Sequence, residues 1–171
     1  PDASQVNFTL VPFADLERIE VLHGPSGPFG KNTLGGAVNL VTRRGGPQPF
    51  ASAEASYGSF GQIEGRAQVG GQRGAFDYYV SGRYRQEDGW RDAAYTRTAQ
   101  VFAKGGWKNG NTDVWLSYTF ATDSLLQAGS VPISWLQYRD SIPPRWRNTD
   151  DARKINFTGG DFFGPTMHFL N

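Results

Sequence analysis

The chain has 171 residues, which is enough for one domain with a buried core, and its composition excludes several classes of protein. It has no cysteine, which excludes a disulfide framework and a thiolate metal site, and its net charge of +1 provides no broad basic face for nucleic acid. Glycine accounts for 22 residues, nearly twice the usual share of about 7%, and 14% of the residues are aromatic. We therefore expect many tight turns that join aromatic-rich strands.

The first 46 residues are predicted to contain two strands on either side of a glycine-rich loop. The strands are LERIEVL, residues 16–22, and AVNLVTR, residues 37–43. The loop between them fails the pattern of a phosphate-binding loop, because Pro25 stands where the first glycine is needed and Asn32 where a hydroxyl is needed. Pro28 likewise excludes a nucleophile elbow around Ser26. The loop is therefore not assigned to phosphate binding or to catalysis.

From residue 49 onward the pattern changes to strict alternation of apolar and polar side chains. Five stretches follow it: 51–57, 62–69, 76–85, 98–107 and 113–120. This period of two predicts consecutive antiparallel strands, each with one apolar and one polar face. Short connectors rich in glycine and asparagine are predicted hairpin turns, whereas residues 86–95 and about 123–164 form longer connectors.

Two architectures fit this alternation. A soluble β-sandwich adhesin or carbohydrate-binding module would bury the apolar faces and expose the polar ones. A membrane β-barrel would do the reverse, and two features favour it, namely charges in the middle of strands and aromatic residues at strand ends. The charged residues are Glu54, Glu64, Arg66 and Arg83, and the aromatic ones are Tyr57, Phe76, Tyr84, Trp107 and Phe120.

The segment VPFADLERIEVLHGPSGPFGKNTLGGAVNLVTRRGG resembles the end of the plug domain of TonB-dependent outer-membrane receptors. That family has an ERIEV strand, a GP turn, an aromatic-glycine loop and a strand of the type GG-x-[VI]-N-[IL]-[IV]-T-[KR]. The stretches YGSFG and DGWRD resemble the first two outer loops of the same family. The chain departs from it at His23, where arginine is usual, and at Pro28 and Phe29, where LY is common.

The resemblance implies an all-β internal fragment of a larger protein. Residues 1–46 would be the C-terminal part of a globular plug domain, and residues 47–171 the first five to six antiparallel strands of a large transmembrane barrel. Residues about 123–164 would form a long outer loop. The implied function is active transport of a scarce ligand, such as a ferric siderophore or other iron complex, across the bacterial outer membrane. The partners would be outer-membrane lipid and TonB, which would contact a segment upstream of this chain.

The resemblance also suggests roles for three groups of residues. Aromatic and arginine side chains in the long loop are candidates for contacting an anionic, partly apolar chelate, although packing of the loop explains each one equally simply. These residues are Trp135, Tyr138, Arg139, Arg145, Trp146 and Arg147. The plug loop would be shaped by backbone bends at Gly24, Pro25, Gly30, Gly35 and Gly36. Arg43 and Arg44 are candidates for ion pairs between plug and barrel wall, with solvent-exposed charge as the alternative.

Neither a catalytic site nor a cofactor is predicted. His23 and His168 are the only histidines and lie in different regions, which does not suit an imidazole metal site. Glu54 and Glu64 fit an acid/base pair by residue type, but a solvated strand face explains them without catalysis. We therefore expect a protein that is not an enzyme.

Overall fold

The computed structural model describes residues 11–24, 35–127, 129, 133–134 and 161–171, and the part of the chain that it describes forms two antiparallel sheets. A 3-10 turn, η2 (Phe13–Asp15), leads into the two-stranded sheet of β1 (Leu16–His23) and β2 (Gly36–Thr42). We refer to these three elements as the hairpin. The large sheet contains β3 (Phe50–Tyr57), β4 (Ile63–Arg73), β5 (Phe76–Glu87), β6 (Tyr95–Asn109), β7 (Thr112–Gln127), β8 (Asp161–Phe163) and β9 (Thr166–Leu170). The prediction of an all-β, antiparallel fold is confirmed.

The strands of the large sheet pair in chain order from β3 to β7, each with the next. Both β8 and β9 pair with β7, so together they occupy one further position at the edge of the sheet. Pro165 lies between them, where it has no N–H to donate, and its carbonyl accepts a hydrogen bond from the Asp123 N–H at 3.0 Å. The described strands therefore fill six positions.

The strand β7 is longer than the sequence pattern predicted. It continues seven residues beyond Phe120 to Gln127, and β8 begins at Asp161, so the connector between them spans residues 128–160 rather than about 123–164. The alternation had ended because Thr122 and Ser124 are polar on the face that carries apolar side chains earlier in the strand. Backbone pairing with β6 nevertheless continues as far as the pair Tyr95–Leu126.

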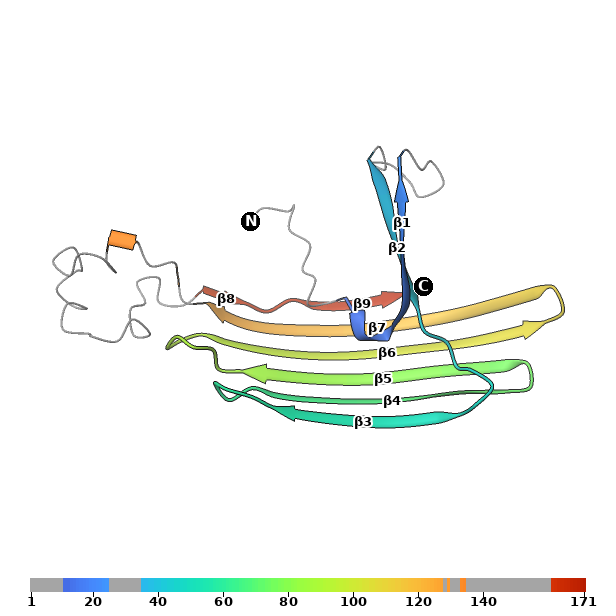
Figure 1. Ribbon diagram of the computed structural model, residues 1–171, viewed down its shortest axis with the longest axis horizontal. Helices are drawn as coiled ribbons and strands as arrows, with labels where there is room; N and C mark the ends of the chain where they lie inside the picture. The colour runs from blue at the N-terminus through green and yellow to red at the C-terminus, as the bar shows by residue number, and fades with distance from the viewer. Residues whose placement is uncertain (1–10, 25–34, 128, 130–132, 135–160) are drawn as a thin grey trace.

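The two ends of the large sheet differ in their connectors. The tight turns after β4 and β6 lie at one end together with residues 43–49, which lead from β2 to β3 (Figure 1, right). The connectors after β3, β5 and β7 lie at the opposite end. We call this second end the rim.

The two faces of the large sheet have the burial that is unusual for a soluble protein. On the polar face Tyr79 and Phe102 are 0% and 2% exposed, while on the apolar face Val80 and Leu116 are 40% and 59% exposed. The rings of Phe50, Tyr79 and Phe102 form a row across the polar face, with centroids of neighbouring rings 6.3 and 5.9 Å apart. The packed interior of the described residues therefore lies on the polar face.

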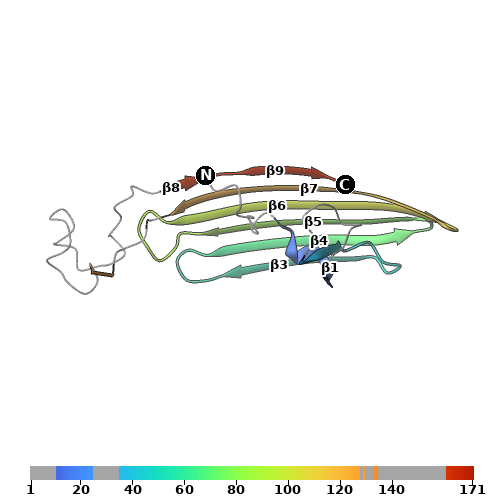
Figure 2. The same cartoon turned by 90° about the horizontal axis from the view of Figure 1, so that it is seen from above.

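The hairpin stands on this polar face. Figures 1 and 2 show β1 and β2 projecting from one side of the large sheet and running across the direction of its strands. Gly45, in the connection to β3, lies so close to the backbone carbonyls of Gly71 and Tyr78 that a Cβ at this position would collide with them. The chain is thus pressed against the end of β4 and β5 before it enters β3.

Candidate functional site

The hairpin is attached to the polar face of the large sheet by three groups of polar contacts. The first is centred on Arg44, which bridges β5 and β7. Its Nε and Nη2 donate to the two carboxylate oxygens of Asp77 at 3.1 and 2.6 Å, and its Nη1 lies 2.9 Å from both carboxylate oxygens of Asp113. Between these strands lies Gly106, where a Cβ would collide with the Arg44 guanidinium. We call Arg44, Asp77, Asp113 and Gly106 the Arg44 clamp.

The clamp holds its cation in the charged form. The hydrogen bond to Asp77 is the largest cause of a raised pKa at Arg44, burial opposes it, and the hydrogen bond to Asp113 adds to the rise. Fork-shaped pairing of a guanidinium with carboxylates fixes orientation as well as charge. The clamp therefore sets the position at which the chain leaves the hairpin.

The second group is centred on Asp15, at the end of η2. Its side chain is buried, with its residue 6% exposed, and the Tyr79 hydroxyl donates to Asp15 Oδ1 at 2.8 Å. Arg66 Nη2 lies 3.3 Å from the same oxygen and donates to the Ala14 carbonyl at 2.6 Å. A buried carboxylate is costly unless it is paired and hydrogen-bonded, and these contacts meet that need. We call Asp15, Arg66 and Tyr79 the Asp15 anchor.

The third group joins the end of β2 to the middle of the large sheet. Lys104 is buried on β6, and its Nζ donates to Thr42 Oγ1 at 3.0 Å. The same ammonium lies 4.5 Å from the centre of the Trp115 ring. A cation over an aromatic face is stabilised by the ring quadrupole. All three groups thus use polar-face side chains of the large sheet.

The two arginines singled out in the sequence behave differently. Arg44 forms the clamp, whereas the Nε of Arg43 donates to the Leu16 carbonyl at 3.2 Å and its N–H donates to the Asp15 carbonyl at 2.8 Å. Arg43 therefore holds β1 and β2 together at their base. The sequence analysis did not identify Asp15, Asp77 or Asp113, because nothing local distinguishes these carboxylates from solvated ones.

The glycines of the predicted plug loop fall partly within the described residues. Gly24 has a φ of 87° and open space around it, and Gly35 is also unobstructed. Gly36 has a φ of 141°, and a Cβ there would collide with the Leu22 carbonyl, so this position requires glycine. Pro25 and Gly30 lie outside the described residues, as do the candidate ligand-contacting residues Trp135, Tyr138, Arg139, Arg145, Trp146 and Arg147.

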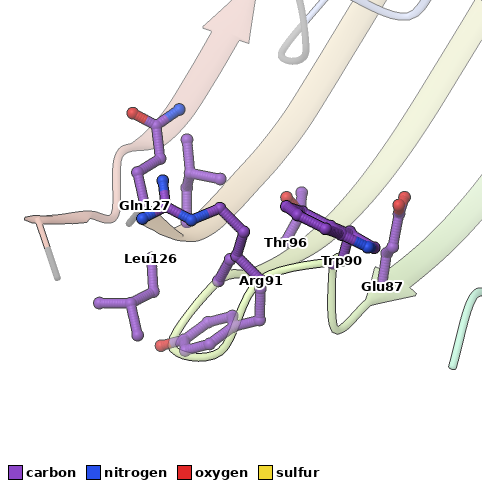
Figure 3. A pocket seen from close by; sticks show the side chains of 10 residues that line it. Glu87, Trp90, Arg91, Thr96, Leu126 and Gln127 are labelled. Atoms are coloured by element: carbon purple, nitrogen blue, oxygen red, sulfur yellow. The ribbon is translucent and has the colours of Figure 1, made fainter. Parts of the chain in front are cut away.

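A separate pocket of about 530 Å³ lies at the rim (Figure 3). It is formed by the end of β5, the connector 88–94, the start of β6 and the end of β7. The lining residues are Glu87, Gly89, Trp90, Arg91, Ala94, Tyr95, Thr96, Leu125, Leu126 and Gln127. We call it the rim pocket. The sequence analysis did not identify it, because its residues come from three separate segments.

The described residues contain no cluster of three or more histidine, cysteine, aspartate or glutamate side chains suited to a metal ion. His23 lies in the hairpin and His168 in the large sheet, where its Nδ1 is 2.8 Å from the Tyr118 hydroxyl. Glu64 is paired with Arg83 at 2.8 Å. Within the described ranges, no helix has the length and apolar character needed to cross a membrane.

Comparison with known proteins finds two receptors that resemble this chain. The ferric aerobactin receptor of Klebsiella pneumoniae is 28% identical over 156 residues, which cover 90% of this chain and 18% of that receptor. The metal-pseudopaline receptor CntO of Pseudomonas aeruginosa (strain UCBPP-PA14) is 30% identical over 99 residues, which cover 56% of this chain and 14% of that receptor. No family model matches the chain. The chain thus spans less than a fifth of the length of these receptors and is similar to a segment of each.

Proposed function

We propose that the chain is part of a TonB-dependent receptor that transports an iron or other metal complex across the bacterial outer membrane. In this proposal the large sheet is a section of a transmembrane barrel wall, with its apolar face toward lipid and its polar face toward the lumen. The hairpin is the C-terminal part of a plug inside that lumen. Residues 1–46 would belong to the plug and residues 47–171 to the barrel.

The observation that carries the proposal is the reversed burial of the two faces of the large sheet. Its apolar side chains are exposed along the full width from β4 to β7, while its polar side chains are covered. The exposed set on β5 runs from Phe76 to Tyr84, which is close to the 9–11 residues of a tilted strand that crosses a bilayer. Water does not favour so large an apolar face, whereas hydrocarbon does.

The same burial opposes the alternative of a soluble β-sandwich adhesin or carbohydrate-binding module. A sandwich needs a second layer against the apolar face. In the described residues the hairpin packs instead on the polar face, through the Arg44 clamp and the Asp15 anchor. A globular piece attached by ion pairs to the polar side of a curved wall is what a plug requires.

The choice of ligand class rests on the two similar receptors. Their names specify ferric aerobactin and metal-pseudopaline, so a metal chelate is the ligand class that we assign to this chain. TonB would supply the energy through a part of the receptor outside this chain. No catalytic role is assigned, and the described carboxylates of the polar face serve in ion pairs.

Uptake by cells tests the proposal. A strain that lacks its own outer-membrane metal-chelate receptors would express the full-length receptor that contains this segment, with and without TonB. We expect accumulation of radioactive iron from ferric aerobactin, or of radioactive zinc from its pseudopaline complex, that is lost without TonB. Binding and uptake of neither complex, or uptake that does not depend on TonB, would contradict the proposed function.

A further inference from the structure

The connector between β5 and β6 is a pre-formed turn rather than an open loop. It contains two residues with left-handed backbone, Gly89 with a φ of 74° and Ala93 with a φ of 54°. At its start the Asp88 N–H donates to the Phe60 carbonyl at 2.9 Å. Left-handed backbone at a residue other than glycine persists only where the surroundings enforce it. The connector therefore holds its side chains in fixed places.

Trp90 is the most prominent of these side chains and points toward the polar side. Its residue is 52% exposed, and its ring lies between the side chains of Glu87 and Thr96 (Figure 3). Glu87 and Thr96 are cross-strand partners, and their positions alternate onto the same face as Tyr79 and Phe102. Trp90 is thus not one of the aromatic residues that would contact lipid, and its exposed ring has another use.

The charges of the rim pocket favour an anion. The carboxylate of Glu87 accepts a hydrogen bond from Arg85 Nη2 at 2.8 Å, so its negative charge is compensated. Arg91 adds a guanidinium to the lining, and its Nη1 donates to the Gly129 carbonyl at the start of the β7–β8 connector. Tyr95, Leu125 and Leu126 make the remaining lining partly apolar. A guanidinium beside a flat indole suits a planar ring that carries an oxyanion.

We propose that the rim pocket binds an aryl oxyanion, such as a catecholate or salicylate arm of a metal chelate, with the ring stacked on Trp90 and the oxygen beside Arg91. This inference rests on the proposed function, because it assigns part of the ligand of the same receptor. The pocket volume of about 530 Å³ accommodates one such arm and lies within the usual range for small-molecule sites. The rest of the chelate would extend from the pocket into the lumen.

Binding of two defined complexes to the full-length receptor tests the assignment. The probes are ferric 2,3-dihydroxybenzoate, which presents aryl oxyanions, and ferric citrate, which has no ring. For Trp90→Ala we expect dihydroxybenzoate affinity to fall about tenfold, which corresponds to about 1.4 kcal/mol, with citrate affinity unchanged. Trp90→Phe keeps a ring and should recover most of the loss. Phe60→Ala, at an exposed aromatic residue of the neighbouring turn that does not line the pocket, serves as the matched control.

Each outcome decides between the two levels of the proposal. Equal affinity of wild type and Trp90→Ala for the dihydroxybenzoate complex would overturn the rim-pocket assignment and leave the transport proposal standing. Equal loss for both probes, in a variant that still migrates as a folded barrel on unheated gels, would also overturn the aryl assignment. Absence of binding of both probes, together with ferric aerobactin and the pseudopaline complex, would contradict the proposed function itself.

Discussion

Arg44 is the single residue whose removal should most weaken the attachment of the hairpin. Arg44→Ala leaves Asp77 and Asp113 without the cation that both contact. Because the clamp is only partly buried, we expect a loss of about 1–3 kcal/mol, between the values for exposed and buried ion pairs. Denaturant unfolding of the full-length receptor in micelles measures this. Arg43→Ala is the control and should change stability by less than about 0.5 kcal/mol; equal effects of the two substitutions would contradict the clamp.

Gly106 provides a second test of the same contact. Gly106→Ala places a methyl group where the Arg44 guanidinium and the Asp77 carboxylate lie, so the pair must separate. We expect a loss similar to that of Arg44→Ala, and the double variant should lose little more than either single one, because both remove the same interaction. A thermodynamic cycle over the four proteins measures the coupling. Losses that simply add would show that Gly106 acts through something other than Arg44.

At the scale of the strand, the two faces should respond oppositely to the same substitution. Ala53 on β3 lies on the apolar face, and Ser56 on the same strand lies on the polar face opposite Glu64. Ala53→Arg places a guanidinium in hydrocarbon, which costs about 2–4 kcal/mol near the midplane, and should reduce the folded fraction. Ser56→Arg gains Glu64 as a partner and should assemble normally. The fraction that resists unfolding in detergent without heating measures both, and equal assembly would count against the lipid face.

The strands of the large sheet could be predicted because alternation records which face each side chain occupies. All five predicted stretches are strands, with ends displaced by a few residues. The prediction was incomplete at Thr122 and Ser124, because pairing in β7 continues where the apolar signal ends. It also did not foresee that Phe50, Tyr79 and Phe102 pack together, since aromatic residues on a polar face carry no periodic signal.

The polar contacts of the hairpin could be predicted only in part. Arg44 stands out because it directly follows an apolar strand, but its partners lie 33 and 69 residues further along the chain. Which carboxylates meet it depends on the register of β5, β6 and β7 and on where the hairpin rests. Asp15 depends in the same way on Tyr79, which is 64 residues away. Contacts of this kind follow from the fold as a whole.

At the scale of the whole molecule, the exposed apolar face should govern the behaviour of the 171-residue chain by itself. Its six strand positions are fewer than the about eight of the smallest outer-membrane barrels, so the sheet keeps open edges. We expect this chain to aggregate in water and to remain dispersed only in detergent. Sedimentation with and without detergent measures this. A soluble monomer that unfolds cooperatively would support the sandwich alternative instead.

The orientation of the two faces can be measured most directly with spin labels along β5 in the full-length receptor, reconstituted in a bilayer. Labels would replace each residue from 78 to 84 in turn, and oxygen dissolved in the lipid would report contact with hydrocarbon. We expect maxima of oxygen accessibility at Tyr78, Val80, Gly82 and Tyr84, with minima at the intervening positions, which face the hairpin and the lumen. Maxima at Tyr79, Ser81 and Arg83, or the absence of any period of two, would contradict a lipid-facing apolar surface.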